Sequence, residues 1–475
     1  MKVFLFWHGE RHAPKYIMRA LQKNNHHVVY FVGSKEQWAE GLPGTVFHDH
    51  NDAWNGVPAA ALSGEHFTPP ARELIEQFHT LETRILTMMN KRFDWMCVDE
   101  RRHLYYQMLA YWQYVLEKYR PDVLIFSYIP HTVYDFIVYE LALRRNIKTI
   151  TFNDTWIGER SLVYTNFWQG SDALRARLAE NKTKNITLED LPADMQEYYR
   201  IQTKPERDAT PISIKEWRKR YSLFRRMAEK AKMVAAAVKD FTIFEKGARF
   251  ILKQFKSNLK KEYERLQVAP DFAQPFVYVP LQYQPECSTS SLGGVFADQI
   301  LMVEMLSATL PKNWKIYVKE HPKQWLPRGL NYFSSRYEGY YRRLAKLPNV
   351  CIIPLATNTF LLIQKAKAVA TVTGTPGWEA LVRGVPALTF GYPWYRDVPG
   401  LFQVDSVDGC REAFAKIAGG YRVPAQNIFR YLKSLDEACM PAYTETLPSR
   451  PVKNTPEENA NIIIKTILEV MEKST

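Results

Sequence analysis

The sequence predicts an α/β protein of two doubly wound domains, each with a mostly parallel sheet, that face one another across a central cleft. Three observations support this prediction. Short β-branched and aromatic runs alternate with helical stretches in both halves of the chain. A long segment of helical composition separates the two halves. The 475 residues, 46% of them hydrophobic, are enough for two cores of roughly 150–250 residues each.

The first domain is expected to span residues 1–211. Alternating strands and helices are typical of a parallel sheet with helices on both faces, and the first half of the chain has this pattern. Strands are predicted at 3–7, 28–32, 121–126 and 148–152, and helices at 15–24 and 133–145.

A basic helical region is expected at residues 212–269, which contain no proline and a single glycine. Residues 215–265 hold 16 Lys or Arg and six Asp or Glu, so most of the net charge of +13 lies there. The rest of the chain is close to neutral, so a nucleic-acid partner is not indicated. Aromatic residues such as Trp217 and Phe224 among these charges predict a helix at an anionic membrane surface. A solvated insertion or an oligomer contact is the alternative.

The second α/β domain is expected at residues 270–450, followed by a C-terminal helix within 451–475. Strands are predicted at 276–281, 315–319, 350–353, 368–372 and 386–390, with helices at 298–309 and 456–473. Thr455 is the expected N-cap of the last helix. Ligands of open α/β sheets bind at the carboxyl ends of the strands, so the cleft between the domains is the expected site.

Composition and missing motifs exclude several classes of protein. The five cysteines are scattered without a CxxC pair, which favours a reducing compartment. Five apolar residues follow Lys2, too few for a signal peptide, and no run of 18 apolar residues occurs. We therefore expect a cytoplasmic protein, peripheral at the inner membrane face if the basic region binds lipid.

The chain also lacks the motifs of several cofactor classes. HExxH, DxD, Walker A and GxGxxG are all absent, so no metal site, P-loop or dinucleotide site is predicted. The tightest group of metal-ligand residue types is at 48–50, where two histidines flank an aspartate. This group is interpreted as part of a solvated polar loop.

The most informative stretch for function runs from residue 370 to residue 388. A strand ends near Thr373, Gly374 forms a tight turn, and Thr375 is expected to cap a helix that begins at Pro376. Open N–H groups and the two threonine hydroxyls would form an anion site for a phosphate. Glu379, one turn later, suits the two hydroxyls of a ribose. A capped turn with no ligand is the alternative.

A second stretch places a histidine at the end of a predicted strand. His321 can donate a hydrogen bond to a phosphate oxygen and assist a leaving group, and Pro322 fixes the chain's exit from the strand. Lys319 would add positive charge if its side chain faced the cleft. A surface histidine beside a turn is the alternative.

Polar residues also follow the first strand of the second domain. Gln282, Glu286 and Ser288 gather side chains suited to a sugar or an acceptor, and an ordinary hydrophilic loop is the alternative. In the first domain, Asp154 at a strand end is the candidate general base or nucleophile, with Glu159 as the second candidate.

Two further candidates lie at strand ends of the first domain. His8 follows the first predicted strand and His131 follows the strand at 121–126. Both could line the floor of the same cleft and contact the sugar or the acceptor. Each could equally be an ordinary loop residue.

The second half of the chain resembles the capsule-polysaccharide biosynthesis family, bacterial GT-B glycosyltransferases that include the Kdo transferases of capsule assembly. The matching elements are Pro-Leu-Gln with Pro-Glu-Cys-Ser-Thr (280–289), Lys-Glu-His-Pro (319–322) and Thr-Gly-Thr-Pro-Gly-Trp-Glu-Ala-Leu (373–381). Gly-Val-Pro (384–386) and Pro-Gly-Leu (399–401) extend the match. The resemblance covers about 270 residues, best from 276 to 402.

The resemblance implies a metal-independent glycosyltransferase without a cofactor. Its substrate would be a nucleotide sugar with a CMP-linked acidic sugar such as Kdo, and its acceptor a glycan or lipid-linked glycan of the bacterial surface. It also implies that His321 and the hydroxyls of Thr373 and Thr375 meet the phosphate. The Kdo-transferring members carry the catalytic aspartate in a Glu-Asp-Gly-Phe-Leu-Arg-Ser run. The corresponding run at 153–161 keeps Asp154 but has Asn153 in place of the glutamate.

Three alternatives to this function remain. A phosphotransferase that uses CDP-glycerol or CDP-ribitol would have similar histidine and hydroxyl contacts to phosphate. A nucleotide-sugar epimerase would need no acceptor. A catalytically silent glycan-binding or scaffold subunit would keep the fold alone.

Overall fold

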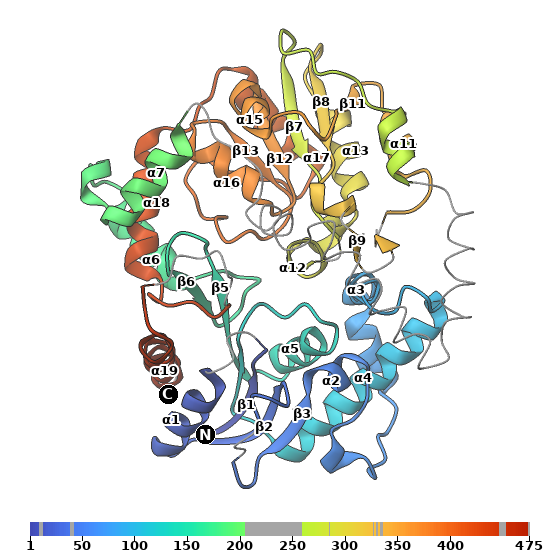
Figure 1. Cartoon of the computed structure of the whole chain (residues 1–475), viewed down its shortest axis with the longest axis vertical. Coiled ribbons are helices and arrows are strands. Elements are labelled where there is room, and N and C mark those ends of the chain that lie inside the picture. Colours follow the sequence, from blue (N-terminus) through green and yellow to red (C-terminus); the bar gives the residue numbers. More distant parts are fainter. Residues whose placement is uncertain are drawn as a thin grey trace, which may run out of the picture.

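A computed structural model describes residues 1–8, 13–38, 42–204, 259–284, 286–325, 327–328, 331–332, 336–445 and 453–473. It contains two six-stranded α/β sheets, one in each half of the chain, with helices on both faces (Figure 1). The predicted fold class is therefore confirmed. Most of the predicted basic helical region, with its proposed membrane contact, lies outside the described residues.

The N-terminal sheet has the strand order β3-β2-β1-β4-β5-β6. All neighbours pair in parallel except β6, which runs antiparallel to β5. The strands are β1 (Lys2–Phe6), β2 (His27–Gly33), β3 (Val46–Asp49), β4 (Val123–Phe126), β5 (Lys148–Asp154) and β6 (Ser161–Tyr164). The helices are α1 (Ala13–Lys23), α2 (His50–Trp54), α3 (Arg72–Met89), α4 (Val98–Tyr119), α5 (Tyr134–Arg144), α6 (Asp172–Asn181) and α7 (Ala193–Thr203), with short 3₁₀ turns η1 (Ala60–Leu62) and η2 (Leu188–Asp190).

The C-terminal sheet has the corresponding order β11-β8-β7-β12-β13-β14, with every neighbour parallel. Its strands are β7 (Phe276–Pro280), β8 (Lys315–Lys319), β11 (Val350–Ile352), β12 (Ala368–Thr371), β13 (Ala387–Thr389) and β14 (Phe402–Gln403), and a small antiparallel pair is formed by β9 (Pro327–Arg328) and β10 (Asn331–Tyr332). The helices are α11 (Leu259–Arg265), α12 (Cys287–Ser290), α13 (Gln299–Thr309), α14 (Tyr340–Ala345), α15 (Thr359–Lys365), α16 (Thr375–Val382), α17 (Val407–Ala418), α18 (Ala425–Ala438) and α19 (Pro456–Glu472), with η3 (Gly294–Ala297) and η4 (Pro322–Trp325).

The predicted strands agree with the observed ones to within one or two residues. They were detectable because strands of a parallel sheet are covered on both faces and read as continuous apolar runs. β4 shows this directly, since all four of its residues are buried. In the two six-stranded sheets, the strands that the sequence did not predict are short: β3, β6 and β14 have four, four and two residues. The two-residue strands β9 and β10 were not predicted either.

The C-terminal part of the chain crosses back to the N-terminal domain (Figure 1). Helix α18 packs against α6, and α19 packs against α1. Ile463, Ile467 and Met471 of α19 share a buried cluster with Ile17 and other residues of the first domain. Thr455 caps α19 as predicted, because its hydroxyl accepts from the N–H of Glu458 and the Glu458 carboxylate accepts from the Thr455 N–H.

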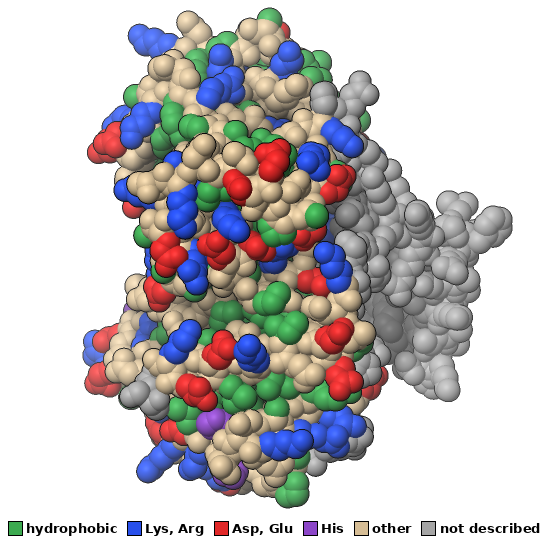
Figure 2. Space-filling view, turned by 90° about the vertical axis from the view of Figure 1, so that its left-hand side faces the viewer, with side chains coloured by type: hydrophobic (Ala, Val, Ile, Leu, Met, Phe, Trp, Pro, Cys, Tyr) green, Lys and Arg blue, Asp and Glu red, His purple; other side chains and the backbone are tan. Residues whose placement is uncertain are grey.

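Charge is balanced on the face formed by α6, α7, α18 and α19. Basic and acidic side chains are interspersed over it without a large patch of one sign (Figure 2). Among the described residues, no helix is both long enough and apolar enough to cross a membrane.

Candidate functional site

Three loops meet at the carboxyl edge of the C-terminal sheet. β7 lies between β8 and β12, and the predicted residues Gln282, His321 and Thr373 follow these three strands. At the usual strand spacing, the ends of β8 and β12 are about 10 Å apart. The two stretches in which a phosphate site was predicted are therefore neighbours across one strand.

A reciprocal amide contact links two of these loops. The Gln282 side chain accepts from the N–H of Thr373 (3.0 Å) and donates to the Thr373 hydroxyl (3.1 Å). The N–H of Gly374 donates to the hydroxyl of Thr371 (3.1 Å). These internal bonds use two N–H groups that were expected to be open to a phosphate. Gln282 braces the turn, and its amide is not presented to a ligand.

The start of α16 differs by one residue from the prediction. Gly374 is the N-cap and Thr375 is the first helical residue, so Thr375 does not cap the helix. Thr375 is exposed, and its N–H has no hydrogen-bond partner within the described residues. The groups at this helix end that remain open to an anion are therefore the N–H and hydroxyl of Thr375, together with the positive end of the helix dipole. Glu379 lies one turn further along and is partly exposed.

His321 is held as a neutral hydrogen-bond donor. Its Nδ1 accepts from the N–H of Lys323 (3.1 Å), which leaves the ring proton on Nε2. Burial lowers the pKa of His321 to about 4, so the imidazole is uncharged near neutral pH. Pro322 directly follows and begins η4.

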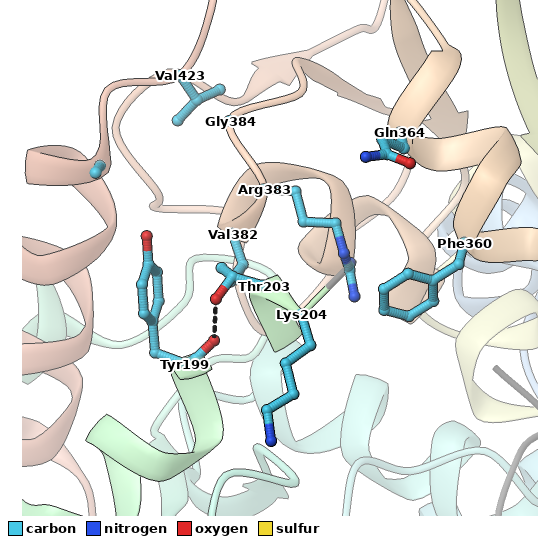
Figure 3. A pocket seen from close by; sticks show the side chains of 10 residues that line it. Tyr199, Thr203, Lys204, Phe360, Gln364, Val382, Arg383, Gly384 and Val423 are labelled. Atoms are coloured by element: carbon cyan, nitrogen blue, oxygen red, sulfur yellow. Dashed lines mark hydrogen bonds between the residues drawn. The ribbon is translucent and has the colours of Figure 1, made fainter. Parts of the chain in front are cut away.

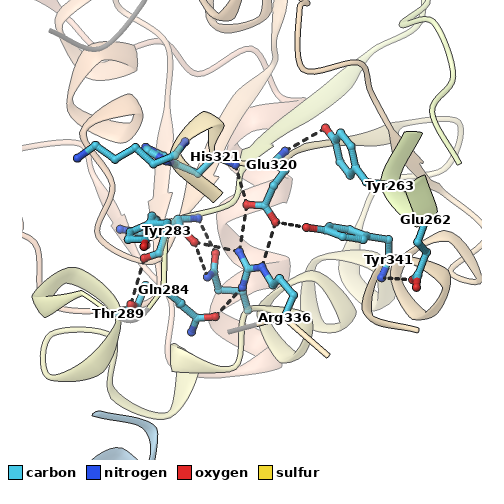
Figure 4. Close-up of polar contacts among 12 residues, drawn as sticks. Glu262, Tyr263, Tyr283, Gln284, Thr289, Glu320, His321, Arg336 and Tyr341 are labelled. Carbon is cyan, nitrogen blue, oxygen red and sulfur yellow. Dashed lines mark hydrogen bonds and ion pairs between the residues drawn. The ribbon is translucent and has the colours of Figure 1, made fainter. Parts of the chain in front are cut away.

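A buried ionic network behind His321 holds this histidine in place (Figure 4). The Glu320 carboxylate accepts from the N–H of His321 (2.6 Å), from the hydroxyl of Tyr341 (2.6 Å) and from the Arg336 guanidinium (3.0 and 3.2 Å). Both charged side chains are 0% exposed. Arg336 also donates to the Gln284 side chain (2.5 Å) and to the carbonyl of residue 282 (2.9 Å). The network therefore fixes the loops after β7 and β8 relative to each other.

Sequence reasoning did not find Glu320, Arg336 or Tyr341. Glu320 is adjacent to His321, but a glutamate before a His-Pro pair gives no sign that it is buried. Arg336 lies 16 residues after Glu320 and in a different loop, so only the tertiary structure brings this ion pair together.

Lys319 does not point its charge toward a ligand. It is 7% exposed, and its ammonium donates to the carbonyl of Thr357 and to the hydroxyl of Thr359 (2.9 Å). Burial lowers its pKa to about 8. The condition under which Lys319 would add positive charge to the cleft is not met, because Thr357 and Thr359 accept its hydrogen bonds.

Glu286 and Ser288 lie at the start of the short helix α12. The carbonyl of Glu286 accepts from the N–H groups of Thr289 (3.0 Å) and Ser290 (2.7 Å). The Glu286 side chain is partly exposed and acts electrostatically on His131, whose pKa is lowered overall by burial. Helix α12, which directly follows Glu286, packs against α3 of the N-terminal domain, so this loop of the C-terminal sheet faces the first domain. We call this region, lined by the residues that follow β4 and β7, the interdomain face.

Asp154 does not reach the interdomain face. It is 0% exposed, and its carboxylate accepts from the hydroxyl of Ser161 (2.5 Å) and from the N–H groups of Thr444 (3.3 Å) and Glu445 (3.4 Å). The expectation that Asp154 faces the cleft is wrong, since the returning C-terminal segment covers it.

Glu159 also contacts the returning segment. Its carboxylate accepts from the N–H groups of Lys453 (2.8 Å) and Asn454 (3.1 Å), just before α19. Both candidate carboxylates of the first domain thus attach the C-terminal segment to that domain.

Three histidines gather at the carboxyl edge of the N-terminal sheet. The rings of His8 and His50 stack at 4.7 Å, and His131 lies 6.2 Å from His8. Burial lowers the pKa of His8 to about 4 and that of His50 to about 3, and it also lowers the pKa of His131. Nδ1 of His131 donates to the carbonyl of Ile129 (2.7 Å), so its Nε2 carries the lone pair.

The interpretation of residues 48–50 as a solvated loop is wrong. His48 is 1% exposed and bonds to the hydroxyl of Tyr30 (2.9 Å) and the carbonyl of Val57 (2.8 Å). His50 joins the histidine group after β3. The alternation of the short strand β3 could have indicated that His48 faces the core. In the described part of the chain, no three His, Cys, Asp or Glu side chains are arranged to hold a metal ion.

A pocket of about 310 Å³ lies at the opposite end of α16 from Thr375 (Figure 3). It is lined by residues from α7, α15 and the α16–β13 turn, among them Tyr199, Phe360 and Arg383. Arg383 lies over the Phe360 ring at 3.9 Å. The pocket is remote from the strand ends that carry the candidate site, so we do not assign the chemistry to it.

The fold and site together define a protein of two doubly wound α/β domains whose C-terminal sheet presents a helix N-terminus and a neutral histidine at one edge. Residues 244–416 match the family described as "Capsule polysaccharide biosynthesis protein". The resemblance stated from the sequence is thereby confirmed for the C-terminal half of the chain. The N-terminal run at 153–161, which was compared with the same family, lies outside the matched residues.

Comparison with characterised proteins gives a local match to a capsule protein. "Capsule polysaccharide modification protein LipA" of Neisseria meningitidis serogroup B (strain ATCC BAA-335 / MC58) is 35% identical over 80 residues. This stretch is 17% of the present chain and 10% of LipA. The LipA of serogroup A / serotype 4A (strain DSM 15465 / Z2491) matches at 34% over the same length.

Solved structures give only distant likenesses. The KpsC β-Kdo 2,7 transferase of Thermosulfurimonas dismutans has 14% identity and a TM-score of 0.29, covering 68% of this chain and 88% of KpsC. The UDP-GlcNAc 2-epimerase of Neisseria meningitidis has 12% identity and a TM-score of 0.24, covering 99% of this chain and all of the epimerase. At these TM-scores, the fold assignment rests on the two sheets of the chain itself.

Proposed function

We propose that the protein is a nucleotide-sugar-dependent glycosyltransferase of capsule polysaccharide synthesis. In this proposal the C-terminal domain binds the donor nucleotide, and a phosphate lies between the start of α16 and His321. The donor is a CMP-linked acidic sugar such as Kdo, and the acceptor is a surface glycan or its lipid-linked precursor. The observation that carries the proposal is that His321 and Thr375 follow β8 and β12, two strands separated by β7 alone. Both residues lie in a segment that matches a capsule-synthesis family.

The proposed chemistry depends on a phosphate leaving group. As the bond between sugar and phosphate breaks, negative charge develops on the phosphate oxygens. The Nε2–H of neutral His321, the N–H and hydroxyl of Thr375 and the α16 dipole all favour that charge. Because His321 is neutral, it stabilises the charge as a hydrogen-bond donor without first having to bind a proton.

The acceptor side of the proposal involves the first domain. His131 has an unprotonated Nε2 and lies near Glu286 across the interdomain face, with His8 beside it. A hydroxyl of the acceptor that approaches from this side could donate to that nitrogen. Asp154 is not part of this proposal, since it is buried beneath the C-terminal segment.

The test is turnover of defined donors by the full chain. CMP-Kdo, CDP-glycerol, CDP-ribitol and UDP-GlcNAc are incubated with the protein, and release of nucleotide or diester product is followed by phosphorus NMR. The glycosyltransferase proposal predicts CMP release from CMP-Kdo. Exclusive turnover of CDP-glycerol or CDP-ribitol would replace it with the phosphotransferase alternative, and the absence of any nucleotide effect on the melting temperature would favour a scaffold.

A histidine variant tests the assigned role directly. His321→Ala is expected to reduce donor turnover by at least ~100-fold, the usual effect of removing one donor that stabilises transition-state charge. His66→Ala is the matched control, because His66 is exposed and lies in the other domain. Wild-type rates in the His321 variant would refute the assignment.

A further inference from the structure

Arg84, on α3 of the N-terminal domain, lies where the two domains meet. Helix α3 packs against α12 and η3 of the C-terminal domain, and Figure 1 shows it beside α12, to the lower right. The Arg84 guanidinium lies over the ring of Trp168 at 5.0 Å. That ring in turn contacts Tyr392 of the C-terminal domain, with ring centroids 5.1 Å apart.

The charge of Arg84 is not neutralised within the described chain. No ion pair or hydrogen bond joins it to a described residue, and its Nε is buried without an acceptor. Glu140, a carboxylate that acts on it electrostatically, already accepts from Arg144 (2.7 Å) and from the indole of Trp168 (2.7 Å). Burial lowers the pKa of Arg84, as expected for a cation that has lost water without gaining a partner.

The guanidinium also lies beside the loop that follows β13, which packs against the end of β12. A Cβ added to Gly294 would lie 3.8 Å from Arg84 Nη2 and 3.6 Å from Tyr392, so these groups surround the same point. Gly391, next to Tyr392, packs against Thr373, since a Cβ on Gly391 would lie 2.7 Å from the Thr373 methyl group. Arg84 therefore reaches from the first domain to the loop beside the end of β12.

Arginine is suited to such a position. It stays charged when partly buried, and its planar group pairs in bidentate fashion with carboxylate or phosphate oxygens. A cation that is desolvated but unpaired is costly in the free protein, and a bound anion would remove that cost. We propose that Arg84 binds an oxyanion of the substrate held between the two domains, either a donor phosphate or a sugar carboxylate. This inference rests on the proposed function.

The first measurement needs no nucleotide. Arg84→Gln is expected to melt at the same temperature as the wild type or higher, because it removes an unpaired charge. Arg72→Gln is the matched control on the same helix, since Arg72 is exposed and, among the described residues, forms an ion pair with Glu76 alone. Inorganic phosphate is expected to raise the melting temperature of the wild type and the control more than that of the Arg84 variant.

Calorimetry then separates the two sources of the anion. A loss of 10–100-fold in CMP affinity in Arg84→Gln, the range of a charge-assisted bidentate contact, assigns the donor phosphate. Unchanged CMP affinity with a similar loss for intact CMP-Kdo assigns the sugar carboxylate. Arg84→Lys, which keeps the charge, is expected to recover part of either loss.

Failure of the proposed function and failure of the inference about Arg84 give different results. If the wild type binds no nucleotide, the proposed function fails, and the phosphate-dependent melting still decides whether Arg84 binds an anion. The inference about Arg84 is overturned if Arg84→Gln matches the wild type within twofold in three quantities: the melting-temperature shift with phosphate, the affinity for CMP and the affinity for CMP-Kdo.

Discussion

Replacing Glu320 by glutamine is the sharpest test of how the site is held together. In the native protein the carboxylate accepts four hydrogen bonds, two from Arg336 and one each from Tyr341 and the His321 N–H. Glutamine offers one acceptor oxygen and places an NH₂ group where donors already point. It also leaves the Arg336 charge fully buried without its counter-ion.

The expected loss follows from the burial of the pair. Breaking a buried ion pair by removing one partner typically costs about 3–5 kcal/mol, because the remaining charge is uncompensated. For a domain of roughly 200 residues, 1 kcal/mol corresponds to about 2–4 °C, so we expect Glu320→Gln to lower the melting temperature by about 6–20 °C. Hydrogen exchange should accelerate first in β8, whose end the network fixes.

The matched control uses the same change on the same domain. Glu304 lies 3.6 Å from Arg343 with both side chains well exposed, so Glu304→Gln should cost less than about 1 kcal/mol. A double-mutant cycle with Arg336→Met measures the coupling between the two charges. A shift of less than 2 °C in Glu320→Gln, or no coupling in the cycle, would refute the account of the network.

Three further predictions concern stability. His48 has a folded-state pKa of about 4, below its usual 6.5, so the stability it contributes is present above pH 6.5 and is lost as pH falls toward 4. His48→Gln should therefore reduce by about 3 kcal/mol the fall in the free energy of unfolding between pH 7 and pH 4, measured by urea titration. Gly377→Ala should cost about 1–3 kcal/mol by thermal melting, since the new Cβ would lie 2.5 Å from the hydroxyl of Tyr395. Asp154→Asn should destabilise by about 1–3 kcal/mol and speed proteolysis near residue 445, because an amide group replaces an acceptor of the C-terminal segment.

Controls for these predictions come from exposed positions. Gly64→Ala should be neutral, because no atom lies within 4 Å of the added Cβ. Asp172→Asn changes a carboxylate that is 83% exposed and should leave proteolysis unchanged. If the free energy of unfolding depends on pH in His48→Gln as it does in the wild type, the explanation for His48 is contradicted. If a control variant loses as much stability, or is cleaved as fast, as the variant it is paired with, the explanation for that variant is contradicted.

Much of the fold was predictable from the sequence because parallel strands and helix ends leave local signals. Apolar runs marked most strands of both sheets, and the Thr455 capping pattern marked the start of α19. The rule that ligands gather at strand ends placed His321 and Thr373 at the same edge of the predicted sheet. The strand order of the structure then shows that a single strand, β7, separates the two strands that they follow.

The parts of the site that could not be predicted depend on where side chains point. Gln282 was correctly placed at a strand end, but nothing in its neighbours indicates that Thr373 takes both ends of its amide. Asp154 and Lys319 also lie at strand ends, yet segments distant in sequence cover them. Periodicity identifies the edge of a sheet, whereas contacts between distant segments decide which side chains remain open there.

The packing of α19 against α1 has a consequence for how the chain acquires its structure during synthesis. The residues of α1 emerge from the ribosome long before their partners Ile463, Ile467 and Met471 of α19. An apolar surface of the N-terminal domain therefore stays uncovered until α19 has been translated. Nascent chains halted before residue 456 should accordingly recruit holding chaperones, and emergence of α19 should end that dependence.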